Sequence, residues 1–212
     1  MDQESQQGKD GQRFVERHGR TQRLAHWWVT VFFAAAILTA PGDARGHTAV
    51  LVAHVLAATA LIVGALVVLL GGDRQALAAD LRALRFDDTD RAWVRSLRGK
   101  GAESRPVRWG KFNTGQKVTA RALLVLVVAL LLSGAFDAIS GSKTIHPPLF
   151  AATMLVLAGH VFMAVVNPST RPALRGMVRG SVDRAWARHH HPAWLDEVDP
   201  DPGSDPDPVP GP

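Results

Sequence analysis

The sequence has 212 residues, of which 47% are hydrophobic and 20% charged, and it contains neither Cys nor Tyr. The absence of Cys excludes disulfides, Cys-ligated zinc, iron–sulfur clusters and covalently attached c-type haem. The apolar residues form four runs with the charges almost wholly between them, which excludes an ordinary soluble globule. The formal net charge is +5. Because the basic residues lie beside apolar runs, they indicate a membrane surface and no nucleic-acid partner.

The four apolar runs predict four membrane-spanning helices, at residues 24–40, 48–70, 118–136 and 147–166. A helix needs about 20 residues, with a range of roughly 17 to 25, to cross a bilayer. The third run meets this length if Arg121 extends to the headgroups. The first is the weakest, and Trp27 and Trp28 mark its interface end. A cleaved signal peptide is the alternative for the first run, but the polar lead, residues 1–23, is long for one.

The basic residues predict the orientation of the spans. Of the 24 Lys and Arg, 22 lie in the lead, in the segment from Gly71 to Arg121, or after the fourth span. Only Arg45 and Lys143 lie in the other two connections. The positive-inside rule then places both termini in the cytoplasm. We expect an all-α, integral-membrane four-helix bundle in the cell inner (plasma) membrane.

The polar segments surround this domain, which we place at residues 24–194. The cytoplasmic loop, residues 71–117, contains ALAADLRALRF, a pattern typical of a short amphipathic surface helix. Residues 195–212 are acidic and Pro-rich, and we expect them to be disordered. The cluster His189, His190 and His191 has two interpretations, a solvated group near the membrane or a contact with a partner subunit.

Four histidines lie in or at the edge of the apolar runs: His26, His54, His146 and His160. An ionisable group at membrane depth is costly and is therefore a functional candidate. His146 and His160 are 14 residues apart, which is about 21 Å along one helix and within roughly 40° of the same face. By depth, His26 pairs with His160 near the inner surface, and His54 pairs with His146 near the outer surface.

Each predicted pair can hold one metal between two imidazoles, and bundles commonly build cofactor sites between facing helices. Two such pairs are what two non-covalent b-type haems need. The alternative is that each histidine is a hydrogen-bonded packing residue. His47, at the outer start of the second span, is the main rival to His54 as a ligand. Gly64 and Gly134 allow either a porphyrin edge or a neighbouring helix to approach closely.

Several stretches of the sequence resemble one known family. They are RTQRLAHWW (residues 20–28), GKFNTGQK (110–117), GHVFMA (159–164) and ALRGMVRGSVDRAWARHHHPAW (173–194). The chain resembles the gamma subunit, a cytochrome b, of membrane-bound, quinone-linked formate dehydrogenases. Its first His-Trp pair is shared more widely with cytochrome b561-like and hydrogenase cytochrome b subunits.

The resemblance implies the same four haem ligands and an electron-transfer, quinone-reducing role within an oxidoreductase complex. It implies a menaquinone or ubiquinone site at Asn113 and Gly115 with His160, and Gln116 is a second possible hydrogen-bond donor. It also implies an iron–sulfur beta subunit and a molybdopterin (Mo/W) alpha subunit as partners, with a higher oligomer possible. The formate site cannot lie in this chain, because the chain has no Cys and no large soluble domain. The residues alone are equally compatible with Asn113 as the N-cap of the third span.

Two other functions remain open from the sequence. The first keeps the haems but changes the partner to a hydrogenase or another membrane oxidoreductase. The second is of a different class, a haem-free membrane anchor or assembly factor. The bis-imidazole pairing favours a haem protein over the anchor, and the GQK and GMVRG elements favour formate dehydrogenase over hydrogenase.

Overall fold

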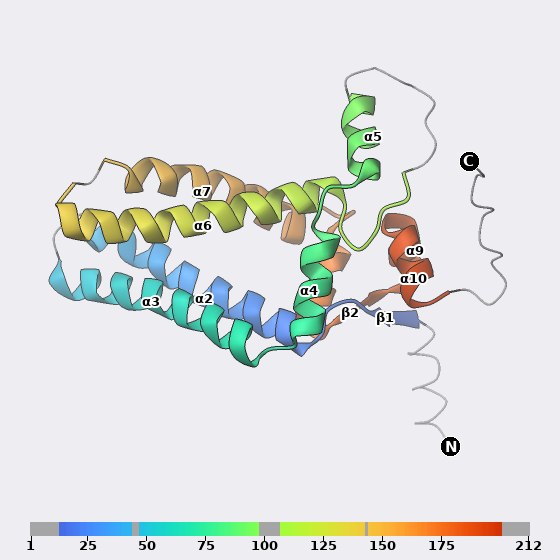
Figure 1. The fold of residues 1–212 in the computed structure, drawn as a ribbon, viewed down its shortest axis with the longest axis horizontal. Coiled ribbons are helices and arrows are strands. Elements are labelled where there is room, and N and C mark those ends of the chain that lie inside the picture. The colour runs from blue at the N-terminus through green and yellow to red at the C-terminus, as the bar shows by residue number, and fades with distance from the viewer. Residues whose placement is uncertain (1–12, 44–46, 98–106, 143, 201–212) are drawn as a thin grey trace. The chain divides into compact units, whose positions relative to one another are not determined.

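The computed structural model describes residues 13–43, 47–97, 107–142 and 144–200 (Figure 1). They divide into two compact units. The bundle unit comprises residues 16–82 and 118–182, and the loop unit comprises residues 83–117 and 183–200 with the few described residues before Glu16. The remaining part of the expected tail, residues 201–212, lies outside the described residues.

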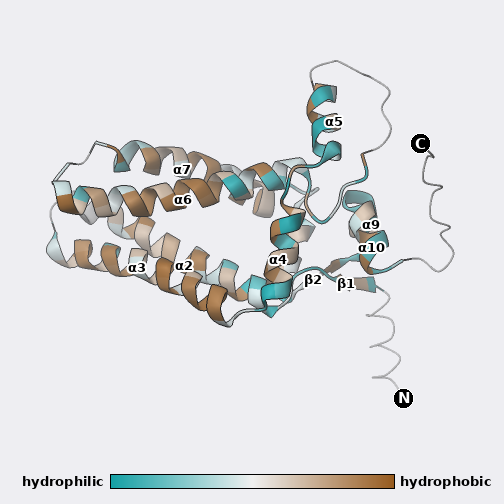
Figure 2. Cartoon of the chain, in the orientation of Figure 1, coloured by the Kyte–Doolittle hydropathy of each residue, from teal (hydrophilic) through white to brown (hydrophobic). Residues whose placement is uncertain are grey.

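Among the described residues, four helices are long and apolar enough to cross a membrane, as the four runs predict. They are α2 (Arg20–Asp43), α3 (Thr48–Gly71), α6 (Thr114–Ser140) and α7 (His146–Val161), the last continued by one π-helical turn, η1 (Phe162–Val166). Figure 2 shows apolar residues along these four helices and more polar residues on the shorter ones. Pro147 and Pro148 lie in the first turn of α7, where a missing backbone N–H costs no helical hydrogen bond.

Helices α2 and α3 lie side by side along their length (Figure 1). The indole Nε1 of Trp28 donates a hydrogen bond of 2.8 Å to the carbonyl of Ala60. A Cβ added at Gly64 would lie 2.1 Å from that nitrogen. Gly64 therefore makes room for Trp28, which is helix packing and not the porphyrin contact considered from the sequence.

Little of the four spans is buried: the buried share is at most 17% in α3 and falls to 0% in α2. A bundle closed by its own side chains would bury one stripe of every helix. Ala57 and Leu61 of α3 are buried. The histidines of the spans are only half-buried. The side chains of the four spans therefore do not close the bundle by themselves.

Short elements complete the chain: β1 (Phe14–Glu16), α4 (Arg74–Ala83), α5 (Asp88–Leu97), the 3₁₀ turn η2 (Arg171–Ala173), α8 (Leu174–Arg179), β2 (Ser181–Asp183), α9 (Arg184–His190) and α10 (Pro192–Val198). Strands β1 and β2 form a two-stranded sheet. The expected amphipathic surface helix corresponds to α4, which ends three residues before Phe86.

Two details at the C-terminal end of the bundle unit bring distant segments together. The backbone N–H groups of Arg17 and His18 donate to the carbonyl of Gly180 at 2.8 and 3.0 Å. Gly180 has a φ of 87°, and a Cβ there would lie 2.9 Å from the carbonyl oxygen of His18. Only glycine adopts this positive φ without strain and also leaves room for the carbonyl oxygen.

The C-terminal segment differs from the expectation at one boundary. Helix α10 continues to Val198, so residues 195–198, which the sequence assigned to a disordered tail, are helical. The reason is packing, because Leu195 has 0% of its surface exposed and Trp194 only 4%. The side chains of Arg184 and Asp199 form an ion pair in the same unit.

Candidate functional site

The four span histidines lie in the two pairs that depth predicts. The ring centroids of His26 and His160 are 6.3 Å apart, and those of His54 and His146 are also 6.3 Å apart. Each pair joins one residue of the α2–α3 hairpin to one residue of α7. All four side chains are half-buried, so each ring is enclosed but reachable.

The separation suits one metal ion between two imidazoles. A metal–imidazole bond is about 2 Å long and the bonded nitrogen lies roughly 1.1 Å from the ring centre, so a linear arrangement needs about 6.2 Å between centroids. Edge-to-face ring contacts span the same range, about 4.5–7 Å. The separation is therefore compatible with one metal ion between the two rings of each pair.

Hydrogen bonds fix which nitrogen of two rings faces the gap. His54 Nδ1 lies 3.0 Å from the carbonyl oxygen of Ala36, and a carbonyl only accepts, so Nδ1 carries the proton. Ser133 Oγ donates to the carbonyl of Leu130 at 3.1 Å and therefore accepts from His146 Nδ1 at 2.9 Å. In both rings the lone pair is on Nε2, the form in which imidazole binds a metal.

Among the residues that the structure describes, no group of three His, Cys, Asp or Glu is placed to hold a metal. A metal held by either imidazole pair would need further ligands beyond these side chains, and a bound haem would supply them. Gly134 lies close to the His146 ring, since a Cβ there would be 3.4 Å from His146 Cε1.

The other histidines do not join the pairs. His47 is exposed at the N-cap position of α3. His191 is 1% exposed, and its Nδ1–H donates to the carbonyl of Gly110 at 2.8 Å within the loop unit. The solvated interpretation of the triple histidine is therefore wrong for His191, because this ring is a buried anchor. His190 stacks near Trp186, with centroids 4.9 Å apart.

Asn113 and Gln116 form a reciprocal cap at the start of α6. Asn113 Oδ1 accepts from the backbone N–H of Gln116 at 2.9 Å, and Gln116 Oε1 accepts from that of Asn113 at 3.1 Å. This is the capping-box arrangement. The cap uses the oxygen of each amide, whereas a quinone carbonyl needs the NH₂ end, so capping and quinone binding are compatible. Gly115 is exposed beside them, and His160 belongs to the bundle unit.

A buried charge cluster that joins the start of α6 to the start of α5 was not predicted from the sequence. Lys117 Nζ donates to Asp90 at 2.7 Å and to Asp87 at 2.8 Å, and Thr114 Oγ1 donates to Asp90 at 2.5 Å. The Lys117 and Asp90 side chains are 4% and 1% exposed. Burial raises the pKa of the more exposed Asp87, but the hydrogen bond and charge of Lys117 outweigh it, so that pKa lies below its ordinary value. The sequence offers no local signal for this cluster, because Asp90 and Lys117 are 27 residues apart.

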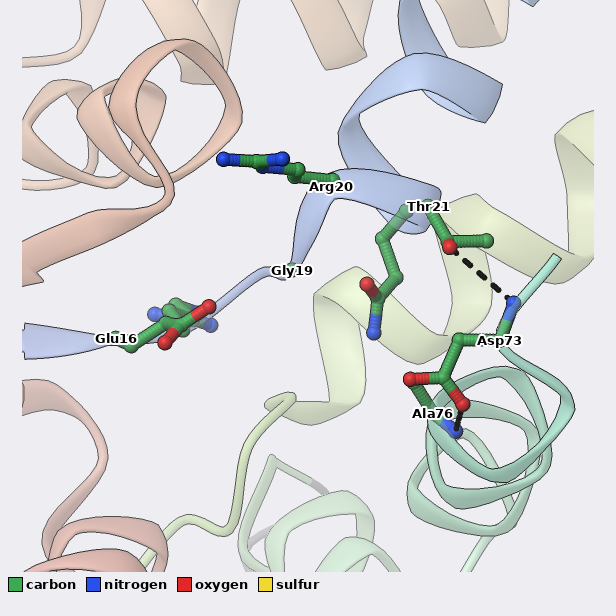
Figure 3. Close-up of a pocket in the computed structure, with 8 residues that line it drawn as sticks. Glu16, Gly19, Arg20, Thr21, Asp73 and Ala76 are labelled. Carbon is green, nitrogen blue, oxygen red and sulfur yellow. Dashed lines mark hydrogen bonds between the residues drawn. The ribbon is translucent and has the colours of Figure 1, made fainter.

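A polar hollow of about 450 Å³ lies at the start of α2 (Figure 3). Its lining includes Glu16, Arg20 and Asp73, and the backbone N–H of Asp73 donates to Thr21 Oγ1 at 3.2 Å. Burial lowers the pKa of Arg17 to about 10, opposed by the charge of Asp80, so Arg17 stays charged at neutral pH. The lining mixes both signs of charge and contains none of the paired histidines, so we assign the hollow no cofactor.

The four spans and the paired imidazoles fit an integral-membrane helical bundle of the haem-binding, cytochrome b class. The chain belongs to the prokaryotic cytochrome b561 family, whose family model matches residues 17–180. It is therefore a membrane protein of electron transport that binds haem b. The family resemblance read from the sequence is confirmed.

Curated relatives agree with this assignment. The chain is 27% identical over 112 residues to the cytochrome b556(Fdn) subunit of the nitrate-inducible formate dehydrogenase of Escherichia coli K12, covering 47% of this chain and 50% of that protein. It is 28% identical over 118 residues to the cytochrome b556(fdo) subunit of formate dehydrogenase from the same organism, covering 50% and 54%. The chain thus spans about half the length of the curated relatives it matches.

Proposed function

We propose that this chain is the membrane subunit of a formate dehydrogenase and carries electrons across the bilayer to quinone through two haem b sites. The observation that carries the proposal is the pair of 6.3 Å imidazole gaps. Bound haem would supply a one-electron Fe(III)/Fe(II) couple at each gap. His26 and His160 would be the axial ligands of one haem, and His54 and His146 those of the other.

The positions of the ligands on α7 support conduction across the membrane. His146 and His160 are 14 residues apart, which is about 21 Å of helix rise. The distribution of Lys and Arg supports cytoplasmic termini in the inner membrane, with the His26–His160 site inside and the His54–His146 site outside. Electrons would enter at the outer site and leave at the inner one.

The names of the curated relatives support formate dehydrogenase as the complex. Formate oxidation would take place on a molybdopterin (Mo/W) subunit, and an iron–sulfur subunit would pass the electrons on. This chain has no Cys, so it cannot bind such clusters itself. Its family membership argues against a haem-free anchor.

The quinone, menaquinone or ubiquinone, would bind at the start of α6. It takes up two electrons and two protons to become a quinol. The side-chain NH₂ groups of Asn113 and Gln116 would donate to a quinone carbonyl, and Gly115, which has no side chain, would let the ring approach the backbone. The resemblance to the family also implies a role for His160 in quinone binding.

Haem content and spectra of single variants test the haem sites. We expect His26→Ala and His160→Ala each to remove the inner haem and to spare the outer one, whereas His54→Ala and His146→Ala do the reverse. The matched control is His47→Ala, which should keep both. Reduced-minus-oxidised spectra and haem extraction per purified chain measure this. Unchanged haem content in the four variants, or loss in His47→Ala, would contradict the ligand assignment.

Two substitutions of Asn113 separate quinone binding from capping. Asn113→Ala removes both the cap oxygen and the NH₂ donor, whereas Asn113→Ser retains a capping oxygen and loses only the donor. We expect both variants to slow quinone reduction while the haems are still reduced by the partner. A normal rate in Asn113→Ser would leave the cap as the only role of this residue.

Purification of the intact complex tests the partner. We expect a large molybdopterin subunit and a ferredoxin-like subunit to co-purify with the chain and to give formate-dependent reduction of its haems. Co-purification of a nickel–iron subunit, with hydrogen as the reductant, would support the hydrogenase alternative instead.

A further inference from the structure

The four paired histidines are not held equally by the protein. Both rings of the His54–His146 pair have an acceptor at hydrogen-bond distance from Nδ1, at 3.0 and 2.9 Å. Among the described residues, the His26–His160 pair has one such neighbour, Thr30 Oγ1, 3.5 Å from His26 Nδ1. That distance is at the outer limit of a hydrogen bond.

The directions of these bonds follow from the chemistry of the partners. The carbonyl of Ala36 can only accept, so His54 Nδ1–H is the donor in this hydrogen bond. Thr39 Oγ1 donates to the carbonyl of Ala35 at 2.8 Å and presents a second acceptor to His54 Nδ1 at 3.2 Å. The proton of Ser133 is directed to Leu130, which leaves its oxygen to accept from His146.

An acceptor at Nδ1–H changes what the imidazole does to a metal on its other nitrogen. It pulls the N–H proton, raises the basicity of the ligating nitrogen, and so favours the more positive state of the metal. For a haem this means the ferric state, and hence a lower reduction potential. Three acceptors on the His54–His146 pair and one distant neighbour on the His26–His160 pair produce a difference between the two sites.

We propose that Ser133, Thr39 and the Ala36 carbonyl set the His54–His146 haem at a lower potential than the His26–His160 haem. This inference rests on the proposed function. One electron moves from the iron between His54 and His146, which is oxidised, to the iron between His26 and His160, which is reduced. The asymmetry makes that transfer downhill toward the proposed quinone site. Ser133 and Thr39 are thus positioning residues, which act through the ligands.

Replacement of the two hydroxyls tests the proposal. Ser133→Ala and Thr39→Val should each raise the potential of the His54–His146 haem. The expected change in the redox equilibrium constant is about three- to tenfold, the scale of one hydrogen bond, and tenfold corresponds to about 59 mV for one electron. Ser133→Thr retains the hydroxyl and should restore the wild-type potential.

The matched controls make the same local bonds without touching a histidine. Ser140 Oγ donates to the carbonyl of Phe136 at 2.9 Å on the same helix, and Thr59 Oγ1 donates to that of Val55 at 2.8 Å. Ser140→Ala and Thr59→Val should leave both potentials unchanged. Optical redox measurements on the purified complex give the potentials, and a His160→Ala background isolates the His54–His146 haem.

The outcomes separate this inference from the proposed function. A wild-type protein that binds no haem would overturn both. Two haems whose potentials are equal, or ordered the other way, would overturn the inference and leave the ligand assignment intact. The inference would also be overturned, with the ligand assignment intact, if Ser133→Ala and Thr39→Val shift the potentials no more than the control variants do. If Ser133→Ala loses the haem, Thr39→Val provides the comparison through the other ligand.

Discussion

Replacing Lys117 with Met should destabilise the loop unit strongly. The substitution leaves the Asp90 carboxylate, 1% exposed, without its cation. Asp90 retains the 2.5 Å bond from Thr114 and a 2.9 Å bond from the backbone N–H of Asp87, but these do not neutralise its charge. Removing one partner of a buried ion pair costs about 3–5 kcal/mol. At about 2–4 °C per kcal/mol for a chain of this size, the unfolding midpoint should fall by roughly 10 °C.

The assay is thermal unfolding of the detergent-solubilised protein at constant haem occupancy. Arg91→Met is the control, because Arg91 and Asp88 form an exposed pair at 2.9 Å, for which about 0–1 kcal/mol is expected. Adding Asp90→Asn to Lys117→Met removes the uncompensated charge and should recover about half of the loss. A Lys117→Met midpoint equal to that of the control, or a double variant worse than the single one, would refute this reasoning.

Two further predictions concern packing and pH. Gly64→Ala should displace Trp28 and lower the free energy of unfolding by about 1–3 kcal/mol, measured by thermal unfolding. Gly71→Ala on the same helix is the control and should be neutral, because a Cβ there would meet no atom within 4 Å. Equal unfolding midpoints for the two variants would contradict the clash. Because the pKa of Asp87 is lowered in the folded state, its pairing with Lys117 stabilises the protein above the unfolded pKa, about 3.9, and this is lost as the pH falls through the folded value. The small advantage of wild type over Asp87→Asn, under about 1 kcal/mol for an exposed group, should therefore be present at pH 7, begin to fall below about pH 4 and be lost below the folded pKa. An advantage that grows in acid would contradict this sign.

The spans and the imidazole pairs could be predicted because bilayer thickness and helix pitch constrain them directly. Four apolar runs determined four helices. The 14-residue spacing of His146 and His160, with alternating span direction, determined which rings face one another. These arguments need only the rise per residue and the sign of flanking charge.

The polar loop unit could not be predicted in the same way, because tertiary contacts decide its structure. Asp87 and Lys117 are 30 residues apart, and nothing local indicates that a lysine beside a span is buried among carboxylates. From the sequence His191 looked like one member of a solvated cluster, but its ring is buried and bonded to the carbonyl of Gly110. Leu195, within an acidic and Pro-rich stretch, is ordered by burial alone.

Each imidazole pair bridges α7, made late in translation, to the α2–α3 hairpin, made early. Within the described residues, α2 and α3 contact one another along their length, whereas α7 makes few contacts with either. Insertion of the prosthetic group would then join the last span to be made, α7, to the α2–α3 hairpin, which is already complete. Newly made chains should therefore be degraded faster when iron-porphyrin is scarce. Pulse–chase measurement of their turnover in haem-starved cells tests this.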